Sequence, residues 1–88
     1  MDIETLMTKL AQAGITTVIK ADDERWAEGT RAWTVILSGA ALGDQGAIRT
    51  ESSDLPSGLR NVLGRLAARP GNWSWLTEFT SPRRAESR

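Results

Sequence analysis

The sequence predicts a single two-layer α+β domain, in which two helices pack on one face of a three-stranded antiparallel sheet. The chain has 88 residues, which is enough for one hydrophobic core. Two segments with apolar residues at the helical period flank three β-branched segments, so the expected order is αβββα. We assign residues 1–79 to this domain, and residues 80–88, which have no apolar period, to a frayed C-terminal tail.

The first helix is expected over residues 2–13. Asp2 is suited to the N-cap, and Gly14 stands where a C-cap glycine belongs. The apolar residues recur at spacings of three and four and share one side of the helix: Ile3, Leu6, Met7 and Leu10. This side is expected to pack on the sheet.

Three strands are expected between the helices. Residues 14–21, GITTVIKA, are β-branched and end at a pair of aspartates. Residues 32–38, AWTVILS, alternate in polarity, but Ile36 lies on the second face, which favours a central strand covered in part on both sides. Residues 46–52, GAIRTES, are shorter and more polar and predict an edge strand. The glycine-rich segment 38–46 lacks the Lys-Ser/Thr pair of a phosphate loop and is expected to be a flexible connection.

The connection DDERWAEGTR, residues 22–31, is longer than a tight hairpin needs. It either extends the two strands into a long ribbon or contains a helical turn closed by Gly29. In the ribbon, the side chains of Asp22 and Glu24 would lie on the same side. Two carboxylates placed in this way could hold a Mg²⁺ ion. The spacing does not match a calcium loop, and we predict a solvated loop with no metal site.

The second helix is expected over residues 56–69. Pro56 suits the first helical turn and Pro70 ends the helix, whereas Gly58 and Gly64 weaken it. Its apolar residues span an arc wide enough to pack on a sheet: Leu59, Val62, Leu63 and Leu66.

The composition excludes several function classes. The chain has no Cys, His or Tyr, so disulfides, imidazole bases, nucleophilic triads and zinc sites lack their parts. We therefore predict a non-enzyme without a cofactor. The longest aliphatic run is residues 35–37, and the acidic N-terminus is not a secretory signal, so a cytoplasmic protein without a membrane partner is expected. Nine Arg against two Lys suggest a bacterial source.

The charge is unevenly distributed, which raises the question of nucleic acid. Residues 1–28 carry six acids and three bases, whereas residues 55–88 carry two acids and six bases. The helix–three strands–helix order over residues 2–69 resembles the double-stranded RNA-binding domain. In that family, a lysine cluster at the start of the second helix and a loop between the first two strands contact RNA. Here the helix start, residues 54–58, carries no positive charge and the loop is acidic. The alternative nucleic-acid-binding residues are Arg60, Arg65 and Arg69.

The segment PGNWSWL, residues 70–76, places Trp73 and Trp75 one residue apart. If it is extended, both rings face the same way, with Leu76 opposite. The rings then either close the core or form an exposed apolar strip that marks an interaction surface. A mixed outcome, with one ring buried and the other partly exposed, is the expected one.

These observations predict a small interaction module of the accessory, adaptor, inhibitor or immunity type, which binds another protein. We expect the acidic loop to steer the module toward a basic partner. The alternative function is weak RNA or DNA binding, and a homodimer that pairs the third strand is compatible with either. The predicted contact residues are Trp26, Arg31, Trp73 and Trp75.

Overall fold

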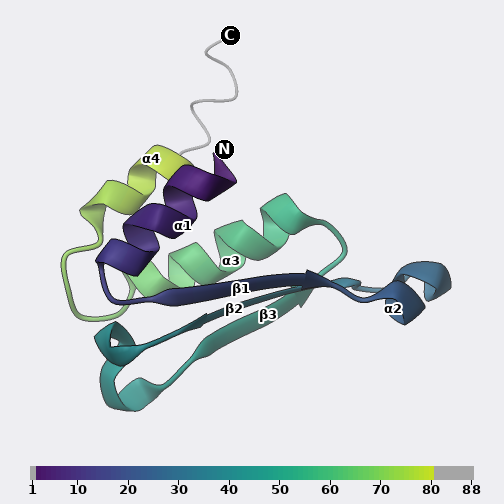
Figure 1. Ribbon diagram of the computed structural model, residues 1–88, viewed down its shortest axis with the longest axis horizontal. Coiled ribbons are helices and arrows are strands. Elements are labelled where there is room, and N and C mark those ends of the chain that lie inside the picture. Colours follow the sequence, from purple (N-terminus) through teal and green to yellow (C-terminus); the bar gives the residue numbers. More distant parts are fainter. Residues whose placement is uncertain (1, 81–88) are drawn as a thin grey trace, which may run out of the picture.

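Three antiparallel strands form one sheet in the computed structural model, which describes residues 2–80 (Figure 1). The spatial order is β1-β2-β3, so the predicted central and edge positions of the second and third strands are confirmed. Two long helices lie on one face of the sheet, which confirms the α+β fold. The tail was predicted over residues 80–88; residue 80 ends a short helix, and residues 81–88 lie outside the described residues. The elements that build these two layers are α1 (Ile3–Gln12), β1 (Thr16–Ala21), β2 (Trp33–Ser38), β3 (Ile48–Ser52) and α3 (Leu55–Ala67).

The core lies between the sheet and the helices. In the register, Val35 of β2 stands between Ile19 of β1 and Thr50 of β3. Alternate residues of a strand point to the same face, so Val35 and Leu37 both face the helices, where they are fully buried. They pack in one cluster with the buried side chains of α1 and α3: Leu6, Leu10, Leu59, Val62, Leu63 and Leu66.

Both long helices begin at an aspartate cap. The Thr5 N–H donates to Asp2 Oδ1 at 3.2 Å, and the Ser57 N–H donates to Asp54 Oδ2 at 2.9 Å. The caps provide acceptors for amide groups that have no partner within the helix. The predicted N-cap Asp2 is therefore confirmed, as is the place of Pro56 in the first turn of α3.

The two β–β connections both contain helical turns. Residues 22–31 hold α2 (Asp23–Glu28), which confirms the helical alternative and its closure by Gly29, with φ 73°. The connection after β2, expected to be a flexible one, contains the 3₁₀ turns of η1 (Ala40–Gln45), which are interrupted at Gly43, and Leu42 in it is buried. The Arg69 side chain fixes this segment, since Nη1 donates to the carbonyl oxygens of Leu42 at 3.3 Å and Gly46 at 3.0 Å.

The Trp-rich segment, considered above as an extended chain, is instead helical over residues 74–76. Trp73 caps the 3₁₀ helix η2 (Ser74–Leu76), which leads into α4 (Thr77–Thr80). A 3₁₀ helix has three residues per turn, so Trp73 and Leu76 point the same way and are both buried. Trp73 is 9% exposed and Trp75 is half-buried, which confirms the expected mixed outcome.

Candidate interaction surface

Helix α2 projects from one end of the sheet (Figure 1). It carries an exposed indole ring, that of Trp26. Trp26 is 62% exposed, and the other large apolar side chain exposed within residues 2–80 is Val18, at 43%. The ring of Trp26 meets the ring of Trp33 edge to face, with centroids 6.4 Å apart. This contact positions the Trp26 ring and leaves most of its surface in solvent.

The local sequence fixes both ends of α2. Asp22 Oδ1 accepts the backbone N–H groups of Glu24, at 2.9 Å, and Arg25, at 3.2 Å. At the other end, Gly29 adopts the left-handed conformation, and the Thr30 N–H donates to the Arg25 carbonyl at 3.0 Å. The hydrogen bond from the Arg25 amide is the main cause of a lowered pKa of Asp22. A six-residue helix is too short to be stable alone, and these caps supply part of what it lacks.

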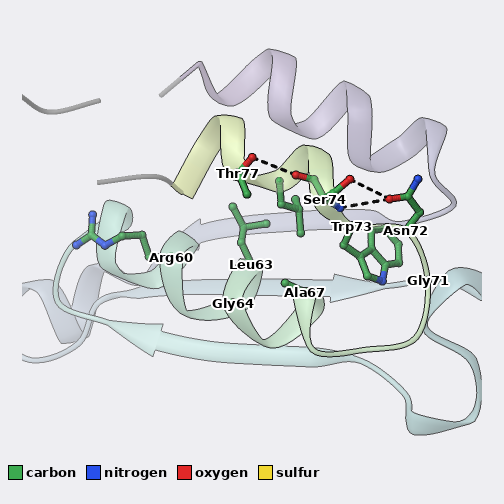
Figure 2. A pocket seen from close by; sticks show the side chains of 10 residues that line it. Arg60, Leu63, Gly64, Ala67, Gly71, Asn72, Trp73, Ser74 and Thr77 are labelled. Carbon is green, nitrogen blue, oxygen red and sulfur yellow. Dashed lines mark hydrogen bonds between the residues drawn. The ribbon is translucent and has the colours of Figure 1, made fainter. Parts of the chain in front are cut away.

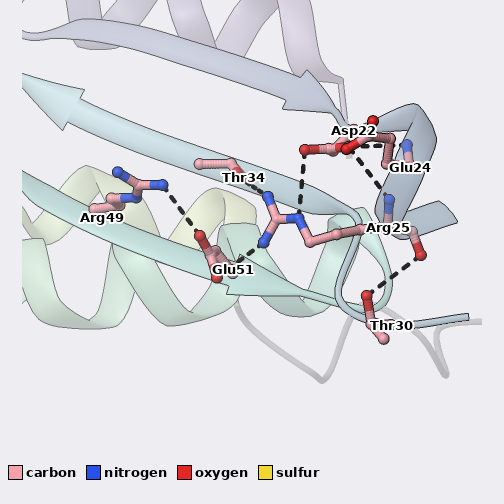
Figure 3. A network of polar contacts seen from close by, with 7 residues as sticks. All are labelled: Asp22, Glu24, Arg25, Thr30, Thr34, Arg49 and Glu51. Carbon is pink, nitrogen blue, oxygen red and sulfur yellow. Dashed lines mark hydrogen bonds and ion pairs between the residues drawn. The ribbon is translucent and has the colours of Figure 1, made fainter. Parts of the chain in front are cut away.

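The side chain of Arg25 ties α2 to the sheet (Figure 3). It turns back across the face opposite the long helices, where Nη1 forms an ion pair with Glu51 of β3 at 2.9 Å. Nη2 donates to the hydroxyl of Thr34 in β2 at 3.1 Å, and Nε lies 3.5 Å from Asp22. Thr34 is completely buried, and Arg25 provides its hydroxyl with a hydrogen-bond partner. Three contacts therefore hold the base of the helix that presents Trp26.

Glu51 also pairs with Arg49 Nη2 at 3.0 Å, and the charge of Arg25 is the main reason that the pKa of Glu51 is lowered. A carboxyl with a lowered folded-state pKa stabilises the fold while it is ionised. That contribution is complete above the carboxyl's ordinary pKa and is lost as the pH falls through the lowered one.

We therefore expect the free energy of unfolding to fall as the pH drops below about 4, the ordinary carboxyl range. Glu51→Gln should have a lower free energy of unfolding than wild type at pH 7. This free energy should also decrease less than that of wild type as the pH falls into the acid range. Urea unfolding at a series of pH values measures both effects. Glu28→Gln, on the exposed surface of α2, is the matched control. Parallel pH profiles for wild type and Glu51→Gln would show that the ionised Glu51 carboxylate does not stabilise the fold.

The structure separates the four predicted contact residues into two groups. Arg31 is exposed near the base of α2 and lines a shallow hollow of about 330 Å³ with Arg49, Thr50 and Glu51. Trp73 and Trp75 belong to the η2–α4 segment at the opposite end of the molecule (Figure 1). Trp26 and Arg31 are therefore the two predicted residues that share one end of the fold.

Trp73 and Trp75 have clear intramolecular contacts. The Trp73 Nε1–H donates to the Pro70 carbonyl at 3.2 Å, and the ring belongs to the core cluster. Trp75 meets the ring of Phe79 edge to face at 6.3 Å, and Lys9 Nζ stands 5.9 Å from its centroid. These contacts favour the role of core lid for Trp73.

A second hollow, of about 480 Å³, lies between α3 and residues 71–77 (Figure 2). Leu63, Ala67 and Trp73 line it, and Arg60 stands at one end. Asn72 Oδ1 accepts the Ser74 hydroxyl at 3.0 Å, which fixes the turn at the rim. The hollow follows from the small side chains on this side of α3.

Two of the three arginines considered for nucleic acid bind the protein's own backbone. Arg65 Nη1 donates to the carbonyl of Arg49 on β3 at 2.8 Å. Arg69 holds η1, as described above. Arg60 Nη2 donates to the Ser57 hydroxyl at 3.3 Å on its own helix. The first two side chains therefore stabilise a strand edge and a loop.

Sequence reasoning singled out Trp26 as a candidate contact residue but did not single out Arg25, Thr34 or Glu51. One signal was present, because Arg25 is the single base among the acids of residues 22–28. A single cation in such an acidic run is expected to pair with a carboxylate. Its partner Glu51 lies 26 positions along the chain, on a strand whose register the local sequence does not reveal.

Within residues 2–80, no three His, Cys, Asp or Glu side chains gather so as to hold a metal ion. In the same part of the chain, no helix has the length and apolar character needed to cross a membrane. Comparison with protein-family models, curated proteins and solved structures gave no match. The candidate function is therefore argued from the α2 surface itself.

Proposed function

We propose that the protein is a non-enzymatic interaction module that binds another protein through Trp26, with Arg31 at the edge of the contact. One observation carries the proposal: an exposed indole stands on a short helix that is capped at both ends and tied to two strands through Arg25. The cytoplasmic location and the bacterial source stay predictions from the sequence.

The energetics of an exposed, rigidly held indole favour binding. A tryptophan side chain can bury 150 Å² or more in an interface, and tryptophan is enriched among the residues that dominate binding energy. Holding α2 in place before binding also reduces the conformational entropy lost in the complex. The hydrogen bonds of Asp22 and the ion pair of Arg25 with Glu51 do this here.

The charge of α2 indicates the kind of partner. Asp23, Glu24 and Glu28 are exposed, whereas Arg25 is half-buried and faces the sheet. The surface around Trp26 is therefore acidic, which favours a basic protein surface and speeds its approach at low salt. The same charge repels phosphate backbones, so this end of the molecule is unsuited to nucleic acid.

Trp26→Ala is expected to abolish capture of a discrete protein from a lysate of the source organism, and to weaken the purified complex by about 30-fold or more. The variant should stay folded, because it removes one edge-to-face contact, worth about 1 kcal/mol. Trp75→Ala, at the other end of the molecule, is the matched control and should capture the partner as wild type does. Isothermal titration with the purified partner and thermal unfolding of each variant provide the two measurements.

The proposal fails if Trp26→Ala and wild type bind the captured protein equally. Nuclease treatment separates the alternative function. Loss of the captured material after nuclease, together with a steep fall of affinity with salt, would favour nucleic-acid binding through Arg60 and its neighbours instead.

A further inference from the structure

The outer edge of β1 carries backbone groups that point away from the sheet. The Asp22 N–H donates to the Ala32 carbonyl at 2.8 Å, which continues the β1–β2 ladder beyond Ala21. In an antiparallel pair, alternate residues direct both backbone groups to the partner strand. Lys20 and Val18 therefore bond to β2, and the backbone groups of Thr17, Ile19 and Ala21 point outward.

The opposite edge of the sheet, β3, has an outward carbonyl that already accepts a hydrogen bond. By the same alternation, Arg49 directs its backbone groups outward from β3, and its carbonyl accepts from Arg65 at 2.8 Å. The exposed side chain of Arg49 adds a second cation on this edge. Charged side chains at an edge oppose the pairing of another strand. The third strand, which the sequence suggested for a homodimer, is therefore the less suitable edge.

We propose that β1 pairs with β1 of a second copy of this chain, antiparallel across a two-fold axis at Ile19, to form one continuous six-stranded sheet. In this register Ile19 lies opposite Ile19 of the second copy, and Thr17 lies opposite Ala21. Each outward N–H then meets an outward carbonyl, because the three positions are symmetric about the central one.

The side chains on both faces suit this pairing. Ile19 is half-buried at the margin of the core, and an isoleucine opposite it would extend the core across the axis. On the other face, Val18 is 43% exposed and would lie opposite Lys20 of the second copy. The aliphatic stem of a lysine can cover such a side chain while its ammonium group stays in water.

Charge favours a second copy in the antiparallel orientation. Parallel pairing would place the two acidic α2 helices side by side, whereas antiparallel pairing places them at opposite ends of the doubled sheet. The chain has a formal net charge of zero, so two copies do not repel one another as a whole. β1 itself carries one charge, Lys20, which lies opposite a valine in this register.

The experiment measures mass and amide exchange of the full chain over a wide concentration range. Sedimentation equilibrium should show a mass rising from 9.6 kDa toward twice that value. In hydrogen exchange followed by NMR, the amides of Thr17, Ile19 and Ala21 should become protected as the dimer forms. The amides of Val18 and Lys20, which bond to β2 within one chain, should be protected at every concentration.

Ala21→Pro is the decisive variant, because it removes an outward donor and no hydrogen bond of the chain's own ladder. It should stay monomeric at concentrations where Ala21→Val, which keeps the N–H, is dimeric. Trp26→Ala should dimerise as wild type does, so failure of this proposal is distinguishable from failure of the docking function.

Three results would overturn the proposal. The first is a wild-type monomer at every concentration, with rapid exchange of the Ile19 amide. The second is a dimer whose formation leaves the amides of Thr17, Ile19 and Ala21 unprotected, which would place the interface elsewhere. The third is protection of these amides in a complex with another protein while the chain alone stays monomeric, which would assign the edge to a strand of that protein. The wild-type exchange measurement stands even if Ala21→Pro does not fold.

Discussion

Trp73→Ala is expected to lower the free energy of unfolding by about 3–5 kcal/mol, the usual cost of truncating a buried aromatic side chain. The ring is 9% exposed, belongs to the core cluster and lies beside the C-terminal end of α3. Its Nε1–H also bonds to the Pro70 carbonyl. A domain of this size has a total stability of about 5–10 kcal/mol, so the change removes a large fraction of it.

Urea unfolding followed by far-UV circular dichroism measures this loss. Trp75→Ala is the matched control, because the same side chain is removed two positions along the chain, where it is half-buried. The control is expected to cost about 1–2 kcal/mol, mainly the contacts with Phe79 and Trp73. Equal midpoints for the two variants would mean that Trp73 is not the lid of the core.

Gly39→Ala is expected to destabilise the protein by about 2–4 kcal/mol, through backbone strain and a steric clash. Gly39 has φ 125° and ψ 174°, a conformation that side-chain-bearing residues rarely adopt. An added Cβ would lie 2.5 Å from the carbonyl oxygen of Gly14 and 3.3 Å from Ile15 Cα. Both atoms belong to the backbone before β1, so neither can move aside without disturbing the sheet.

The matched control for Gly39→Ala is Gly64→Ala, which makes the same chemical change with the opposite expected sign. Gly64 lies inside α3 on its exposed side, and an added Cβ would meet open space. Alanine is the better helix former, so this variant should gain up to about 1 kcal/mol. Thermal unfolding of the two variants beside wild type tests both signs. If Gly39→Ala left the stability unchanged, the β2–η1 junction would tolerate a different backbone path.

The regular elements could be predicted because each has a strong period of its own. The spacing of Leu59, Val62 and Leu66 describes a helix with one apolar side, and Ile36 on the second face of its strand indicated a central position. These patterns depend on residues that are close in the sequence.

The irregular segments were harder because their neighbours in space decide the outcome. Asp22 and Gly29 are good caps, yet six residues between them could form a helix or a ribbon until Arg25 meets Glu51. In PGNWSWL, the spacing of two between the tryptophans would place both rings on one side only if the segment were extended. The spacing of three between Trp73 and Leu76 determines the burial, because both side chains are covered by the same core.

The hydrogen bond from Arg65 to the Arg49 carbonyl also limits how large an assembly this fold can build. A sheet with two receptive edges can add chain after chain, which is the geometry of open-ended fibrils. Here Arg65 and the charged Arg49 guard the β3 edge. Two chains joined at β1 would therefore have a guarded β3 strand at each end of their common sheet. The addition of chains to the sheet would then stop at two copies. Loss of both the Arg65 hydrogen bond and the Arg49 charge would open the β3 edge, and the proposed pair of chains could then add further copies.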